Sequence, residues 1–196
     1  MHIKKILIML SLHLSLYSYG QEERALFESL DFVKFNFRLD KTELNNHYIN
    51  NEQSIKHLGV LLNQVYKQDI DSIKILATAS PEGDFKYNKI LSEKRAKAIK
   101  DYIVSLYPYL SEYKIRTYGT GENWSGLNNY IQRDHNIPHR EDIIKILTEN
   151  KDPGSVEKQL RNINSGISWR YLNKNKFDSL RLGIATIYRN PTQRIE

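Results

Sequence analysis

Strand-like segments that alternate with helical segments limit the fold of this chain more than any other feature. Residues 33–39 alternate apolar and polar side chains, as a half-buried strand does. Three further strands are predicted at 72–79, 114–118 and 180–188. The last strand is separated from the third by more than sixty residues, so the intervening segment must carry structure of its own.

Two helices occupy the spaces between the first three strands. Apolar residues recur at helical spacing over 52–67, with Asn50 or Asn51 as the expected N-cap. A second helix begins after Asp84, its expected N-cap, and ends before Pro108. Its expected apolar stripe comprises Tyr87, Leu91, Ala98, Ile99, Tyr102 and Ile103.

A helical insertion is predicted at 124–176, where Pro138 and Pro153-Gly154 separate helical pieces. The chain therefore runs strand, helix, strand, helix, strand, insertion, strand. This order predicts an α/β (α+β) two-layer sandwich in which the helices pack on one face of a small mixed sheet.

Residues 1–20 have the features of a secretory signal peptide. Lys4 and Lys5 precede an apolar run at 6–16, and a small residue, Gly20, precedes a polar stretch. An N-terminal amphipathic or anchoring helix is the alternative. The mature chain, 21–196, contains no stretch of ~18 apolar residues, so no transmembrane segment is expected in it.

The composition excludes every site that needs cysteine, but it does not identify the function of the basic surplus. The 196 residues include 29 Lys and Arg, 23 Asp and Glu, and no Cys. Without cysteine the chain has no disulfide, no thiolate metal site, no cysteine nucleophile and no cysteine for an N-terminal lipid. The basic surplus alone does not separate nucleic-acid binding from solubility, but the export signal makes nucleic acid an unexpected partner.

No motif of an enzyme, metal site or cofactor site stands out. A G-x-S-x-G nucleophile motif is missing from the sequence. His135 and His139 have the spacing of a helical metal pair, but Pro138 interrupts the helix that would align them. Gly119-Thr120-Gly121 follows a strand and lacks the third glycine of a dinucleotide site, which favours a glycine bulge or turn. We therefore expect a non-enzymatic protein without metal or cofactor.

Arg95 is the most informative charged residue of the second helix. It lies four residues after Leu91 and four before Ile99, at the border of the apolar stripe. A guanidinium at this place needs an acceptor, and a carboxylate that accepts two hydrogen bonds is the strongest choice. An internal salt bridge or an arginine that reaches outward to water are the alternatives.

The segment 79–96 resembles the C-terminal domain of OmpA-like proteins, whose pattern reads T-D-x-x-G-x-x-x-Y-N-x-x-L-S-x-x-R-A. The matching residues are Gly83, Tyr87, Asn88, Leu91, Ser92, Arg95 and Ala96. Downstream, 119–122 resembles the G-x-G-E end of the family's third strand. The resemblance covers about 31–125 and 177–190. The helical insertion between these two parts looks like the insertion of a variant subgroup of the family.

The resemblance implies an OmpA-like domain that associates with the peptide stem of peptidoglycan in the periplasm, at the outer membrane. In that family, the arginine that matches Arg95 binds the carboxylate of the diamino acid, and an aspartate binds its ammonium. Here Ser80 stands in place of that aspartate. Ser80 or Glu82 is then expected at the amine, with Asn88 as a helper.

An alternative reading is an OmpA-like module that serves protein–protein interaction in outer-membrane or fimbrial assembly and does not bind peptidoglycan. Four aromatic residues in the insertion could then form a docking patch, or could simply pack in a core. They are Trp124, Tyr130, Trp169 and Tyr171.

Overall fold

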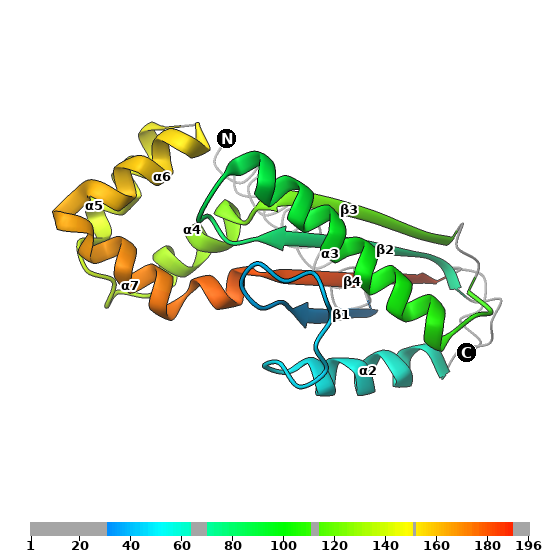
Figure 1. Ribbon diagram of the computed structural model, residues 1–196. Helices are drawn as coiled ribbons and strands as arrows, with labels where there is room; N and C mark the ends of the chain where they lie inside the picture. The colour runs from blue at the N-terminus through cyan, green and yellow to red at the C-terminus, as the bar shows by residue number, and fades with distance from the viewer. Residues whose placement is uncertain (1–30, 64–69, 111–113, 151, 190–196) are drawn as a thin grey trace, which may run out of the picture. The chain divides into compact units, whose positions relative to one another are not determined.

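A four-stranded mixed sheet forms the centre of the computed structural model, which describes residues 31–63, 70–110, 114–150 and 152–189 (Figure 1). The strands are β1 (Asp31–Asn36), β2 (Ile70–Ala79), β3 (Ile115–Glu122) and β4 (Leu182–Arg189). Their order across the sheet is β1-β4-β2-β3. β2 pairs with β3 in parallel and with β4 antiparallel, which confirms the mixed sheet. The predicted signal peptide lies outside the described residues.

Two helices, α2 (Asn51–Asn63) and α3 (Phe85–Leu106), cover the same face of the sheet (Figure 1). The strands bury alternate residues against these helices, as the burial of β2 and β4 shows. The buried side chains of this layer include Val33, Phe35, Phe37, Leu58, Leu62, Ile73, Ile75, Ile99, Ile103, Ala185 and Ile187. The two-layer α+β sandwich is therefore confirmed. From Phe32 onward, the described residues belong to one compact unit.

The helix N-termini agree only in part with the expectation. Asp84 is the N-cap of α3, and its side chain accepts a hydrogen bond of 2.7 Å from the backbone N–H of Tyr87. Asn51 does not cap α2. It is buried and pairs with the main chain of Asn36, accepting from N–H at 2.7 Å and donating to the carbonyl at 2.9 Å. Its amide thus ties α2 to the end of β1, which is an edge strand.

Some boundaries also differ from those predicted. β1 ends at Asn36 instead of continuing to Leu39, because the chain turns there into a loop whose carbonyls face inward. β3 is longer than predicted and includes the glycine-rich segment. The predicted end of the first helix, 64–67, lies outside the described residues.

The glycine bulge predicted at 119–121 is present. Ala77 pairs with Gly119 but Ala79 pairs with Glu122, so β3 has one extra residue here. Gly121 adopts the left-handed φ of +77° that this bulge requires, and its N–H donates to the Ser92 hydroxyl at 2.9 Å. The bulge is thereby fixed to α3.

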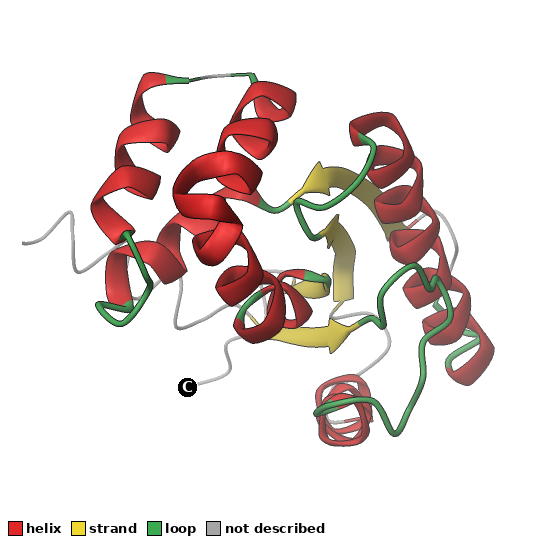
Figure 2. Cartoon of the chain, turned by 60° about the vertical axis from the view of Figure 1, so that its left-hand side comes forward, coloured by secondary structure: helices red, strands yellow, loops and turns green. Residues whose placement is uncertain are grey.

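The insertion folds as helices around its own hydrophobic cluster, apart from the two helices that cover the sheet (Figure 2). Its elements are α4 (Trp124–Arg133), α5 (Arg140–Glu149), α6 (Pro153–Asn162), η2 (Ile163–Gly166), α7 (Ile167–Asn175) and η3 (Phe177–Leu180). Trp169 is 6% exposed and meets Phe177 edge to face at 5.0 Å. Of the two alternatives for Trp169, packing in a core is therefore confirmed and an exposed docking patch is excluded for this ring. Among the described residues, no helix is long and apolar enough to cross a membrane.

The close approach of the α3 backbone to β3 predicts a large effect of Gly119→Ala. A Cβ at residue 119 would lie 2.3 Å from the backbone nitrogen of Glu93, and backbone cannot yield as a flexible side chain does. We expect the free energy of unfolding to fall by about 1–3 kcal/mol in urea denaturation.

Gly59→Ala is the matched control. A Cβ there meets only the Tyr107 hydroxyl, at 3.4 Å, and alanine favours a helix interior by up to about 1 kcal/mol. Gly59→Ala should leave stability unchanged or raise it. Equal effects of the two substitutions would contradict the close packing of α3 against β3.

Candidate functional site

Arg95 lies inside the protein, with a relative exposure of 0%. Its guanidinium donates to three backbone carbonyls: Nε to Lys41 at 2.9 Å, Nη1 to Thr78 at 3.0 Å and Nη2 to Arg38 at 3.0 Å. The side chain is thus buried instead of lying at the border of the apolar stripe, and the alternative of an arginine that reaches outward to water is wrong. The side chain points toward the end of β2 and the loop that follows β1.

The charge of Arg95 has no ionic partner among the described residues, where no carboxylate oxygen lies within 4.0 Å of it. Its guanidinium carbon lies 5.2 Å from the centre of the Phe37 ring. Burial, together with the nearby charge of Arg181, lowers the pKa of Arg95 to about 10, so the group is cationic at neutral pH. Of its five N–H groups, three donate to these carbonyls, and two make no hydrogen bond to the described residues.

A cavity of about 250 Å³ adjoins this guanidinium. It lies between the loop after β1, the loop after β2 and the first turns of α3. Its lining residues are Leu39, Asp40, Ser80, Glu82, Gly83, Tyr87, Asn88, Leu91, Arg95 and Arg181. The structure therefore brings together all four residues predicted for ligand binding: Ser80, Glu82, Asn88 and Arg95.

Asn88 serves to hold the cavity wall together. Its side-chain amide nitrogen donates to the Glu82 carbonyl at 3.0 Å, to the Ser80 carbonyl at 3.4 Å and to Glu122 Oε1 at 2.9 Å. Glu122 is also held by the indole N–H of Trp124, at 2.7 Å. Asn88 thus joins the 80–83 loop to the end of β3, and its donors are used within the protein.

Arg181 is a second buried arginine at the cavity, and sequence reasoning missed it. It is 4% exposed and lies between η3 and β4. Its Nη1 donates to Glu82 Oε1 at 3.2 Å and to Ser80 Oγ at 3.4 Å, and its Nη2 pairs with Asp178. Arg181 therefore lies beside Ser80 at the cavity. The one available signal was a charged residue between Leu180 and Leu182.

Glu82 has one carboxylate oxygen without a partner. Oε2 is buried and makes no hydrogen bond to any described residue, whereas Oε1 pairs with Arg181. Burial raises the pKa of Glu82 above its usual value, although the nearby Ser80 hydroxyl and the charge of Arg181 partly oppose the shift. Two residues that line the cavity, Glu82 and Arg95, thus each keep polar groups without a hydrogen-bond partner among the described residues.

A polar contact at the rim joins the two sides of the cavity. The Tyr87 hydroxyl of α3 donates to the carboxylate of Asp40, and this bond raises the pKa of Tyr87. Asp40 adopts a left-handed φ of 56°, which turns the chain so that the carbonyls of both Arg38 and Lys41 reach Arg95. Tyr87 is half exposed, so it belongs to the rim and not to the core, contrary to its expected place in the apolar stripe.

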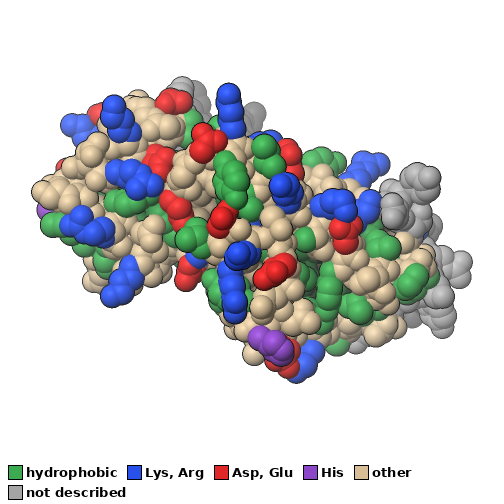
Figure 3. Space-filling model, viewed as in Figure 1, with side chains coloured by type: hydrophobic (Ala, Val, Ile, Leu, Met, Phe, Trp, Pro, Cys, Tyr) green, Lys and Arg blue, Asp and Glu red, His purple; other side chains and the backbone are tan. Residues whose placement is uncertain are grey.

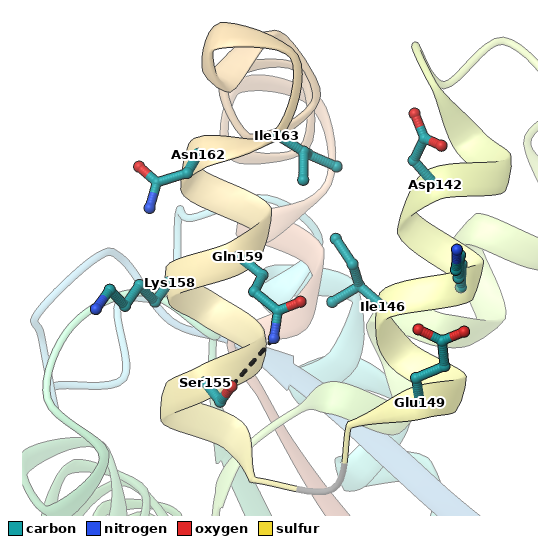
Figure 4. A pocket seen from close by; sticks show the side chains of 9 residues that line it. Asp142, Ile146, Glu149, Ser155, Lys158, Gln159, Asn162 and Ile163 are labelled. Carbon is teal, nitrogen blue, oxygen red and sulfur yellow. Dashed lines mark hydrogen bonds between the residues drawn. The ribbon is translucent and has the colours of Figure 1, made fainter.

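A larger hollow, of about 700 Å³, lies between α5 and α6 (Figure 4). Ile146 and Ile163 face each other within it, while Asp142, Glu149 and Lys158 give it mixed charge. None of the residues predicted for ligand binding lines this groove. On the face seen in Figure 3, basic and acidic side chains are interspersed, so the basic surplus forms no single patch there.

No family model matches the sequence, and a search of curated proteins finds no match. Among solved structures, the chain is similar to the peptidoglycan-associated lipoprotein from Burkholderia pseudomallei, with a TM-score of 0.41 and 14% identity over 81% of this chain and 90% of that one. It is also similar to the OmpA-like domain of FopA1 from Francisella tularensis subsp. tularensis SCHU S4, with a TM-score of 0.41 and 19% identity over 81% and 75% of the chains.

The contacts of Arg95 predict that Arg95→Ala costs about 3–5 kcal/mol of folding free energy, because three backbone carbonyls lose their donors and a void replaces the buried side chain. Urea denaturation followed by circular dichroism measures this. Lys97→Ala, on the exposed side of the same helix, removes only the exposed pair with Asp101 and should cost less than about 0.5 kcal/mol. An Arg95→Ala protein as stable as Lys97→Ala would contradict the structural role of the guanidinium.

Proposed function

We propose that this protein is a non-catalytic component of the cell envelope that binds the peptide stem of peptidoglycan in the cavity beside Arg95. In this proposal the protein is exported to the periplasm and is associated with the outer membrane. The observation that carries the proposal is a buried, cationic guanidinium with two unused N–H groups at a cavity. A carboxylate that accepts two parallel hydrogen bonds is the ligand group that best fits this arrangement.

The choice of peptidoglycan rests on the resemblance of 79–96 to OmpA-like domains. The residues of that motif have physical roles in the cavity: Asn88 holds the 80–83 loop, Ser92 fixes the bulge of β3 and Arg95 supplies the charge. A stem peptide with a diamino acid carries both a carboxylate and an ammonium. The carboxylate would bind Arg95, and the ammonium would bind Glu82 Oε2, the buried oxygen without a donor.

The missing aspartate changes how the ammonium is held. Ser80 is 3% exposed and its hydroxyl faces Arg181, so it supplies no charge for an ammonium. Glu82 supplies the charge from two residues further along the same loop. Because Arg181 already holds Glu82 Oε1, the ammonium is expected to interact with one oxygen only.

Leu39→Glu tests the carboxylate site without removing Arg95. Leu39 lines the cavity and is 58% exposed, so the protein should tolerate a polar side chain there. A carboxylate at this place competes for the guanidinium and repels the ligand carboxylate. We expect retention of the mature protein on purified sacculi to fall at least about tenfold.

Leu39→Gln has the same size as Leu39→Glu and no charge, and it should be retained nearly as well as the wild type. If Leu39→Glu is retained as strongly as Leu39→Gln, the ligand carboxylate does not bind at Arg95.

The raised pKa of Glu82 predicts a pH dependence of binding. An ammonium binds the ionised carboxylate, so binding is lost as the pH falls and Glu82 takes up a proton. Because burial raises the pKa of Glu82 above 4.5, this loss should begin at a higher pH than for an ordinary glutamate. Retention on sacculi, measured from pH 7.5 downward with circular dichroism as a check on folding, gives the midpoint.

Glu82→Gln is the control for titration of the sacculi themselves, which both proteins share. This variant should bind more weakly at pH 7.5 and should lack the Glu82 component of the pH profile. Identical profiles for the two proteins would show that no ligand amine binds Glu82.

A further inference from the structure

The helical insertion contacts the loop that carries Glu82. The backbone N–H of Gly83 donates to Glu157 Oε1, on α6, at 3.2 Å. The two residues are 74 positions apart in the sequence. Their hydrogen bond joins the 80–83 loop to α6 of the helical insertion.

Glu157 is itself held in place within the insertion. Its Oε1 accepts from Arg161 Nε at 2.9 Å and pairs with Arg161 Nη2 at 2.7 Å. The guanidinium of Arg161 lies over the ring of Trp169, 4.5 Å from its centre, and Trp169 packs on Phe177 in the core of the insertion. The side chain of Glu157 is therefore fixed by contacts that lead to the packed core of the insertion.

The carbonyl and one carboxylate oxygen of Glu82 are held from two other directions. Asn88 donates to the Glu82 carbonyl at 3.0 Å, and Arg181, which also pairs with Asp178, holds Glu82 Oε1. The contacts fix both the backbone and one oxygen of Glu82, while Oε2 has no donor. An acceptor that is fixed in this way before the ligand arrives loses little entropy on binding.

We propose that Glu157 is a positioning residue of the ligand site, which holds the 80–83 loop so that Glu82 Oε2 accepts the ammonium of a diamino acid. The inference rests on the proposed function and deepens it, because it gives a residue of the insertion a role in positioning the ligand site. Glu157 does not touch the ligand. It sets the preference for ligands that have an amine over ligands that have only carboxylates.

Meso-diaminopimelate and pimelate separate these effects, since the two compounds share both carboxylates and the chain length and differ in the amines. Both are titrated into the ¹⁵N-labelled mature protein, with the Gly83 amide resonance as the local readout. The wild type should bind diaminopimelate more tightly than pimelate. Glu157→Ala should weaken diaminopimelate binding about three- to tenfold, the effect of one lost hydrogen bond, and should leave pimelate binding within about twofold.

Two variants complete the design. Glu157→Gln keeps an oxygen that can accept from the Gly83 N–H, and it should restore the preference for diaminopimelate. Lys158→Ala changes the adjacent, exposed residue of α6 and should behave as the wild type. Unchanged pimelate binding by Glu157→Ala would also show that this variant is folded.

The outcomes distinguish the inference from the proposed function. If the wild type binds neither compound, the carboxylate site at Arg95 is wrong. If it binds both equally, the carboxylate site stands and the amine site at Glu82 is wrong. If the wild type prefers diaminopimelate and Glu157→Ala keeps that preference, Glu157 does not act by holding the Gly83 amide. The same conclusion follows if Glu157→Gln loses the preference as fully as Glu157→Ala does.

Discussion

The hydrogen bonds of Arg95 connect the parts of the structure on which the candidate site depends. One guanidinium on α3 joins the end of β2, through Thr78, to the loop after β1, through Arg38 and Lys41. Three backbone carbonyls converge on this buried side chain, and a carbonyl that is shielded from water is costly to leave without a donor. The turn at Asp40, with its left-handed φ, follows from the need to direct two carbonyls of one short loop at the same cation.

Arg95 therefore has a structural role and a proposed binding role, and the charges around it are compatible with both. Arg181 lowers the pKa of Arg95, whereas the carboxylates of Asp40 and Glu82 raise it. Neither carboxylate contacts the guanidinium, so the positive charge is compensated only from a distance. A ligand carboxylate that uses the two remaining N–H groups would supply a direct counter-charge without displacing the three carbonyls.

Local patterns predicted the parts of the fold that depend on local interactions. Asp84 caps α3 because its side chain bonds three residues ahead, and Gly121 forms a bulge because its φ is left-handed. The motif of 79–96 also led to all four predicted cavity residues. Arg181 was missed because its contact with Ser80 spans 101 positions. Asn51 was one of two residues expected as the cap of α2, because nothing local indicates that it pairs with Asn36.

The strand order places the insertion at the candidate site. β4 lies beside β2 and antiparallel to it, so the start of β4 meets the end of β2, where the parallel strand β3 also ends. Any segment inserted between β3 and β4 must leave and return at this edge. Its two ends are fixed there, since Asn123 N–H donates to the Ala79 carbonyl at 2.8 Å and Thr78 Oγ1 donates to the Leu180 carbonyl at 2.7 Å. The loop after β2, which carries Ser80 and Glu82, begins at the same edge. Contact between the insertion and this loop is thus a consequence of the topology, and residues of α6 and η3 can alter ligand preference while the sheet and α3 stay unchanged.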